Sequence, residues 1–212
     1  MIALLVSVAL GAPAWNAPSA TPTEGVRLAV GGGAAVLQYG PLPSARLAGA
    51  TDLAAVGVTG SSTVYVGSVV ERFDVVGACW RAVDRERLRL GPLVVAGHHA
   101  GSTSLDTSVK VRAGVAVEGG GERLRGDASL TVVGLGWHPG QPIGRLTTFE
   151  SALGSELGVS WLAGAHRVRL GLLGPLPALR YGWAGERVDV ALTGATMGPT
   201  GSLAQAELGL GF

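Results

Sequence analysis

The chain has little of what builds most other classes of protein. Its 212 residues include a single cysteine, Cys79, which excludes a disulfide within the chain. We expect Cys79 to be a small packed apolar residue rather than a redox or nucleophilic group. Lysine occurs once, at Lys110, and the formal net charge is +1, which gives no support to a nucleic-acid partner. No apolar run reaches the about 18 residues of a transmembrane helix.

Apolar residues and glycine are abundant instead. The hydrophobic fraction is 47% and the mean hydropathy is +0.39, which is high for a chain without a spanning helix. The 35 glycines lie among alternating Val and Leu, so they do not form a low-complexity tract. In strands, glycine marks bends, bulges and close approaches of backbone. The composition therefore favours a strongly curved β-sheet.

Apolar and polar residues alternate along much of the chain. The clearest case is Ser108–Glu118, and Ala152–Trp161, His166–Leu172 and Arg187–Leu192 repeat the pattern. Because strand side chains point alternately to opposite faces, each segment predicts a strand with one apolar and one polar face. Turn signals separate the segments along the whole chain, which indicates an all-β barrel or sandwich.

The last nine residues, Ala204–Phe212, carry this alternation to the final atom. Their apolar face includes Leu208, Leu210 and Phe212, while Glu207 lies on the opposite face. Such a strand, ending in an aromatic residue, resembles the closing strand of bacterial outer-membrane β-barrels. In that family the terminal aromatic belongs to the signal read by the insertion machinery. The resemblance implies that Leu208, Leu210 and Phe212 form a C-terminal insertion signal and that the protein lies in the outer membrane.

We predict an all-β fold: one antiparallel up-and-down transmembrane β-barrel over residues 18–212, with about ten strands and a range of roughly eight to twelve. Ten strands result if Val168–Trp183 is a single strand kinked at Pro175 and Pro177; if these prolines form a turn, the count changes. Ten strands would also place the long His138–Glu150 connection on the periplasmic side, where turns are usually short. A secreted β-sandwich, with its apolar faces packed together, is the alternative.

The aromatic residues lie near the ends of the expected strands. Trp161, Tyr181, Trp183 and Phe212 all have such positions. Amphipathic rings favour the membrane–water interface, so we interpret them as an aromatic girdle. Ordinary packing in a sandwich would also explain them.

The amino terminus reads as a signal peptide. Residues 1–10 (MIALLVSVAL) form an apolar region, and Ala12-Pro13-Ala14 fits the small-residue cleavage pattern. We expect a signal peptide within residues 1–17, cleaved after Ala14 or Ala17. The alternative is a buried first strand, which the nearby prolines oppose.

The polar faces collect most of the charge. If the apolar faces contact lipid, these charges line the lumen, because in hydrocarbon each would cost roughly 2–4 kcal/mol near the midplane. The predicted lumen charges are Arg87, Arg89, Lys110, Arg112, Glu118, Glu156, Arg167, Arg169, Arg180, Arg187, Asp189 and Glu207. They either neutralise one another in a plugged lumen or form the wall of a narrow pore that favours anions.

One cluster of residues suggests catalysis. His98, His99 and Ser102 loosely resemble the lipid A deacylase barrels, in which a His and a Ser on one strand hydrolyse an acyl ester. The spacing departs from that family, since its His and Ser lie two residues apart and an Asn follows. Adjacent His98 and His99 should also point to opposite faces of a strand. With His138 or His166 these histidines lack the spacing of a metal site.

These observations predict a non-enzymatic outer-membrane barrel with a structural or interaction role and no metal or cofactor. The alternatives are a narrow anion-favouring channel and, third, a lipid-modifying hydrolase. The expected partners are outer-membrane lipid and the barrel-insertion machinery, with no nucleic acid and an open oligomeric state.

Overall fold

Twelve antiparallel strands form a closed barrel. The computed structural model describes residues 25–37, 40–67, 70–101, 107–152, 154–173, 176–185, 187–196 and 201–212. The predicted signal peptide, residues 1–17, lies outside these residues. The barrel strands are β1 (Val26–Leu37), β2 (Gly40–Leu53), β3 (Val56–Val66), β4 (Val70–Trp80), β6 (Leu88–Ala100), β7 (Ser108–Gly120), β8 (Leu124–Trp137), β10 (Glu156–Ala163), β11 (His166–Leu173), β12 (Leu176–Ala184), β13 (Val188–Thr196) and β14 (Gly201–Gly211).

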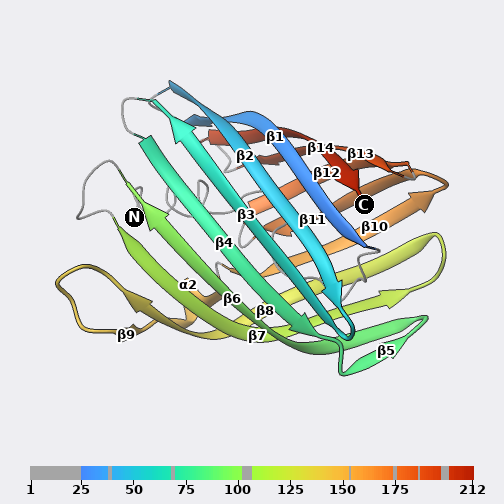
Figure 1. Ribbon diagram of the computed structural model, residues 1–212, viewed down its shortest axis with the longest axis horizontal. Coiled ribbons are helices and arrows are strands. Elements are labelled where there is room, and N and C mark those ends of the chain that lie inside the picture. The colour runs from blue at the N-terminus through green and yellow to red at the C-terminus, as the bar shows by residue number, and fades with distance from the viewer. Residues whose placement is uncertain are drawn as a thin grey trace.

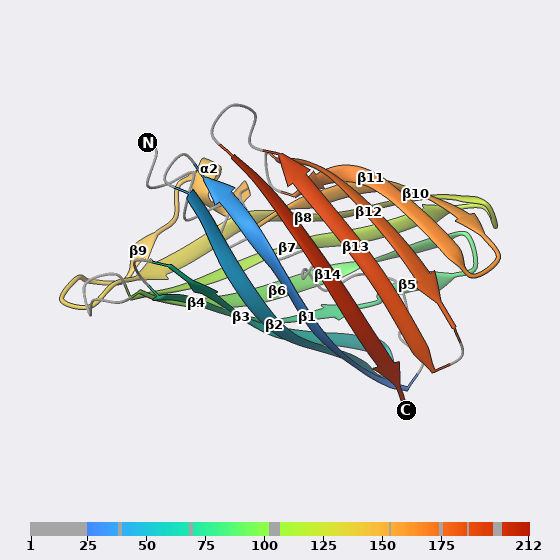
Figure 2. The same cartoon turned by 90° about the horizontal axis from the view of Figure 1, so that it is seen from above.

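Each barrel strand pairs with the barrel strands before and after it in the chain, and the first strand pairs with the last to close the ring. β1 pairs with β14, and β8 pairs with β10 (Figures 1 and 2). The remaining elements are small: β5 (Val83–Arg85) pairs with β6, β9 (Gly144–Arg145) pairs with β8, and the single-turn helix α2 spans Thr148–Ala152. Within the described parts of the chain, no helix has the length and apolarity to cross a bilayer.

The predicted barrel is confirmed, and its twelve strands lie at the upper end of the predicted range. The count of about ten treated Val168–Trp183 as one kinked strand. In the structure this segment divides into β11 and β12, with Pro177 inside β12, which adds a strand. The expected strand Ala152–Trp161 begins only at Glu156, because Ala152 ends α2.

The two ends of the barrel differ. At the end that we call the terminal rim, β1 begins beside the end of β14, and Val26 and Phe212 exchange backbone hydrogen bonds of 3.1 and 2.9 Å. The opposite end, the far rim, carries the connection from β8 to β10 with β9 and α2. Seven barrel strands, an odd number, precede the His138–Glu150 connection, so it lies on the side opposite the termini. This removes the conflict with short periplasmic turns.

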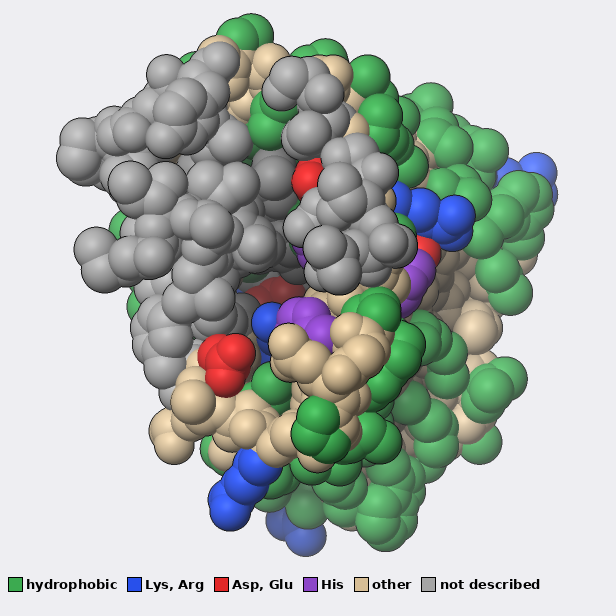
Figure 3. All heavy atoms as spheres, turned by 90° about the vertical axis from the view of Figure 1, so that its left-hand side faces the viewer, with side chains coloured by type: hydrophobic (Ala, Val, Ile, Leu, Met, Phe, Trp, Pro, Cys, Tyr) green, Lys and Arg blue, Asp and Glu red, His purple; other side chains and the backbone are tan. Residues whose placement is uncertain are grey.

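Burial alternates along the strands, and it separates an outer from an inner face. On β14, Leu203, Gln205 and Glu207 are buried, whereas Leu208 and Leu210 are 45% and 44% exposed. Figure 3 looks onto the far rim: hydrophobic side chains cover much of the outside on the right, and acidic, basic and histidine side chains are visible towards the middle, with further basic side chains at the edge. The outer face is therefore apolar and suited to lipid, and the polar groups lie inside.

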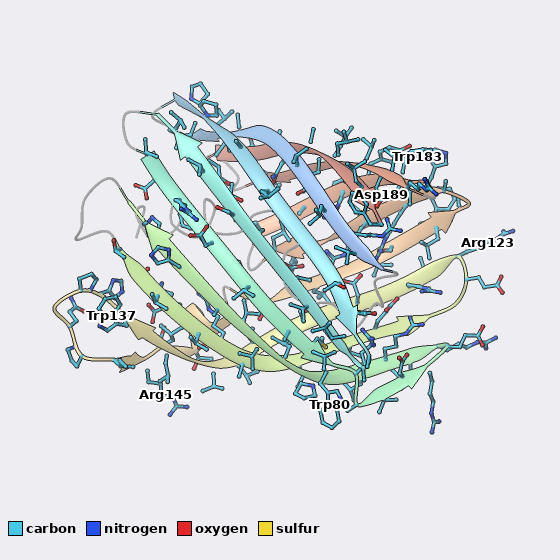
Figure 4. All side chains as sticks on the ribbon, viewed as in Figure 1. Trp80, Arg123, Trp137, Arg145, Trp183 and Asp189 are labelled. Atoms are coloured by element: carbon cyan, nitrogen blue, oxygen red, sulfur yellow. The ribbon has the colours of Figure 1, made fainter. Side chains whose placement is uncertain are left out.

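Aromatic side chains mark both ends of the outer face. Trp80, Trp161 and Trp183 lie near the terminal-rim ends of β4, β10 and β12, and Phe212 follows β14. Trp137, at the end of β8, lies at the far rim (Figure 4). All are exposed rather than packed in a core. This arrangement agrees with the predicted interfacial girdle.

Candidate functional site

The charged interior is the candidate site, because it holds most of the ionisable groups that the strands bury. Of the predicted lumen charges, Arg89, Glu118, Glu156, Arg169, Arg180, Asp189 and Glu207 take part in ion pairs inside the barrel. Arg167 lies 3.8 Å from Asp127 in the same interior. Arg87 and Arg187 are exposed in turns at the terminal rim and do not line the interior.

Glu207 holds two arginines from different strands. Its Oε1 lies 2.8 Å from Nε of Arg46, and its Oε2 accepts a hydrogen bond of 2.9 Å from Nη2 of Arg180. Arg46 is on β2, so this ion pair reaches from β14 to β2 across the intervening β1. Gly31 of β1 makes the crossing possible, since a Cβ there would stand 2.9 Å from Cγ of Glu207.

A second ion pair has the same arrangement on other strands of the barrel. Arg169 of β11 binds Asp127 of β8 across β10, with Nε donating to Oδ1 at 3.2 Å. The strand between them presents Gly158, where a Cβ would lie 2.5 Å from Nε of Arg169. Glu156 adds a second carboxylate 3.7 Å from Arg169.

We call these contacts strand-skipping ion pairs: each joins two strands over a glycine of the strand between them. Arg27 of β1 and Asp189 of β13 form a third, over Gly209 of β14. Figure 4 shows Asp189 on β13, near the terminal rim. These contacts give part of the unusual glycine content a structural purpose. Buried charge pairs add little net stability, but removing one partner leaves an uncompensated charge and is costly.

Sequence reasoning missed Arg46 and Asp127, which are central to these pairs. Arg46 lies in a Gly- and Ala-rich run that alternates only partly. Asp127 lies in a run with a register shift, since the β7–β8 ladder slips between Ala113 and Gly114. Strict alternation was the available signal, and bulges remove it.

Near the far rim, the connection between β8 and β10 folds against the inner face of β7 and β8. Leu146 is buried where Gly134 and Gly136 leave room, and Nε of Arg112 donates to the carbonyl of Glu150 at 3.3 Å. Thr131 of β8 bonds the Ser151 carbonyl through its hydroxyl, and its backbone N–H donates to Oγ of Ser155 at 3.0 Å.

A capping box starts α2. The backbone N–H and hydroxyl of Thr147 donate to Oε2 of Glu150 at 3.0 and 2.9 Å, and the N–H of Glu150 donates back to the Thr147 hydroxyl at 3.2 Å. These bonds, with the nearby charges of Lys110 and Arg112, hold the pKa of Glu150 below its ordinary value. Lys110 and Arg112 thus lie beside a carboxylate at this rim.

The two adjacent histidines face opposite sides of β6, as predicted. His99 pairs with Glu71 and stacks on Phe73 with ring centroids 4.4 Å apart. Nδ1 of His98 lies 3.3 Å from Oδ2 of Asp74. The third residue of the proposed constellation, Ser102, lies outside the described residues. In the described ranges, no group of three or more His, Cys, Asp or Glu side chains could hold a metal ion.

Comparison with known proteins identifies the fold. No protein-family model matches the chain, and no curated protein matches it in sequence. Among solved structures it is similar to outer membrane phospholipase A from Escherichia coli, with a TM-score of 0.51 and 6% identity over 93% of this chain and 98% of that one. It is also similar to the Salmonella typhi outer membrane phospholipase dimer with bound calcium, with a TM-score of 0.52 and 7% identity over 88% and 90%.

Identities this low establish architecture and leave activity open. The shared architecture and the apolar outer face both agree with the predicted outer-membrane location. The chain therefore has the fold of the bacterial outer-membrane β-barrels.

Proposed function

We propose that this protein is a closed outer-membrane barrel with a structural or interaction role, whose lumen is filled by its own paired charges. The supporting observation is that buried interior charges are paired with opposite charges from other strands. Arg46, Arg169 and Glu118 illustrate this: each is buried and lies within 3.3 Å of an opposite charge. Paired, buried charges offer a permeating ion neither space nor an unmatched field.

The test is conductance of the purified, refolded protein in a planar lipid bilayer. We expect no stepwise current across a range of voltages, in membranes where a control porin conducts. A gel comparison of unboiled and boiled protein verifies that the inserted protein is a folded barrel, because closed barrels resist detergent until heated. A stable current from folded protein would contradict the proposal.

A narrow anion-favouring channel is the second candidate, and one observation favours it. Lys110 and Arg112 lie on the inner face of β7 near the far rim, with Glu150 as the carboxylate beside them. If the bilayer experiment yields an anion-selective current, replacing Arg112 with Gln should reduce the selectivity for anions. A current without ion selectivity would exclude this role for the basic pair.

A lipid-modifying hydrolase is the third candidate. The His98–Asp74 contact is the feature in its favour, because a carboxylate orients a catalytic imidazole. In the strand register, however, Asp74 stands between Ser62 and His98, so that hydroxyl lies beside the carboxylate rather than the imidazole. If His98→Ala, His99→Ala and Ser102→Ala all leave membrane lipids unchanged, hydrolysis by these residues is excluded.

We also propose that Leu208, Leu210 and Phe212 form the signal for the insertion machinery. Their side chains lie on the exposed outer face of the last strand, with Phe212 76% exposed. Phe212→Ala should lower the amount of heat-modifiable barrel in cells without lowering the stability of protein refolded in vitro. Equal losses in both would indicate a structural role instead.

A further inference from the structure

A shallow apolar hollow lies in the outer wall of the barrel, across β12, β13, β14 and β1. Figure 2 shows these four strands side by side. The hollow has a volume of about 570 Å³, which is within the range of about 300–1,000 Å³ of small-molecule sites. We call it the outer hollow, and its floor is formed by outward-facing residues with a small side chain or none: Gly32, Ala34, Gly194, Ala204 and Ala206.

The strand register places these small residues together. Ala204 stands opposite Ala34 on β1 and opposite Gly194 on β13. Ala206, the next outward residue of β14, stands opposite Gly32. Directly opposite positions of antiparallel strands lie about 4.5–5.5 Å apart. The five positions therefore form one continuous patch in which no side chain extends beyond a Cβ atom.

Larger side chains border this patch. Towards the terminal rim, the next outward positions are Val30, Leu208 and Val190, with Leu208 opposite the other two. On the β12 side, Leu179 and Tyr181 line the edge. All five side chains are exposed on the outer face. The outer hollow is thus a depression between projecting side chains.

The position of the outer hollow selects the class of occupant. It opens onto the apolar outer face, which contacts lipid in the membrane. Water would find almost no hydrogen-bond partners on this apolar lining. A second barrel related by a twofold axis through the hollow would present the same hollow, so the void would double rather than fill. A flexible acyl chain, by contrast, can enter and contact the floor.

Polar groups lie where the headgroup of such a lipid would be. Nδ1 of His166 and the hydroxyl of Tyr181 are 2.7 Å apart, on the terminal-rim side of the outer hollow. Trp183, opposite His166, belongs to the aromatic girdle of that rim, and Arg187 is exposed in the turn after β12. Arginine is well suited to bind phosphate. We propose that one phospholipid binds here, with an acyl chain in the outer hollow and its phosphate at the terminal rim near Arg187.

The test titrates the folded, delipidated barrel in detergent with phosphatidylglycerol and counts the retained lipids by native mass spectrometry. We expect one lipid per barrel to bind more tightly than the others. Ala206→Leu places a larger side chain in the outer hollow and should weaken this binding about tenfold, which corresponds to 1.4 kcal/mol. Ala96→Leu, on the outer face of β6, is the matched control and should bind as the wild type does. The heat-dependent gel shift verifies that both variants are folded.

Diacylglycerol with the same acyl chains separates recognition of the phosphate from filling of the hollow. We expect it to bind more weakly than phosphatidylglycerol, and Arg187→Gln to reduce this difference. Three results would each overturn the proposal: equal phospholipid binding by wild type and Ala206→Leu, equal binding of the two lipids by wild type, or a barrel dimer that Ala206→Leu dissociates. The outcome is independent of the closed lumen, since a conducting barrel that retains the lipid would contradict only the closed-barrel function.

Discussion

Two strand pairings of the barrel, which we call the first joint (β1 with β14) and the second joint (β8 with β10), are built in different ways. Between β1 and β14, backbone pairing runs from Arg27 opposite Gly211 to Leu37 opposite Gly201. Between β8 and β10, pairing stops where Ser129 faces Glu156, although β8 continues to Trp137.

Beyond Ser129, the far-rim half of β8 is contacted by β9, Leu146 and α2 instead of by β10. These contacts are a short ladder, one backbone hydrogen bond and the bonds of Thr131. The first joint is thus held by a continuous ladder and the second partly by side chains.

Both joints share one device, and this makes the difference instructive. Each is crossed by a strand-skipping ion pair, Glu207 with Arg46 over Gly31 and Asp127 with Arg169 over Gly158. We infer that the ion pairs fix which strands meet, while the ladder decides how firmly the joint stays closed. Local opening draws on elements with few backbone bonds, so the far-rim half of the second joint should open first.

The largest effect should follow from removing the carboxylate at the first joint. Glu207→Ala leaves Arg46 and Arg180 without their shared partner and should cost about 3–5 kcal/mol of unfolding free energy. Asp127→Ala should cost less, because Glu156 remains 3.7 Å from Arg169. Urea unfolding in detergent, followed by tryptophan fluorescence, measures both variants. A larger loss from Asp127→Ala would contradict the inferred charge balance.

The next effect concerns the close approach of backbones at the first joint. A Cβ at Gly33 would stand 2.1 Å from the carbonyl oxygen of Ala204, so Gly33→Ala must displace backbone. We expect a loss of about 1–3 kcal/mol, as for overpacked cores. Gly60→Ala is the control, since its Cβ would lie 3.7 Å from the nearest atom. Equal unfolding free energies of the two variants would show that the β1–β14 pairing accommodates the added Cβ without loss of stability.

A smaller and local effect is expected at the second joint. Thr131→Val removes the hydroxyl that bonds the Ser151 carbonyl and should cost about 1 kcal/mol. Hydrogen exchange should accelerate in residues 138–152, while the heat-dependent gel shift of the barrel persists. Thr51→Val, at the terminal rim, should leave exchange in that segment unchanged. Loss of the whole barrel in Thr131→Val would make this joint as essential as the first.

The smallest effect is a dependence of α2 docking on pH. Because the folded protein lowers the pKa of Glu150, its contribution is present above the ordinary pKa of 4.5 and is lost as the pH falls through the lowered value. Exchange in residues 147–152 should therefore rise in acid. Glu150→Gln should make exchange faster at neutral pH and remove this dependence. Protection in Glu150→Gln equal to wild type at neutral pH would show that the capping box is dispensable.

Period-two alternation determined the class of fold without any tertiary information. Ser108–Glu118 and Ala204–Phe212 showed it because the face of each residue follows from its position in the strand alone. The apolar outside, the inward charges and the opposed directions of His98 and His99 are consequences of the same local rule. The number of strands was less secure, since Pro175 and Pro177 are compatible with both a turn and a kinked strand.

Only the tertiary structure decided which groups meet. Glu207 and Arg46 are far apart in the chain, and they approach because β14 closes onto β1 and Gly31 leaves the space above it. No periodicity records a partner on another strand, and a glycine in a sequence does not reveal which side chain will cross it. The sequence by itself determined the face on which each charge lies; closure of the sheet determined its partner.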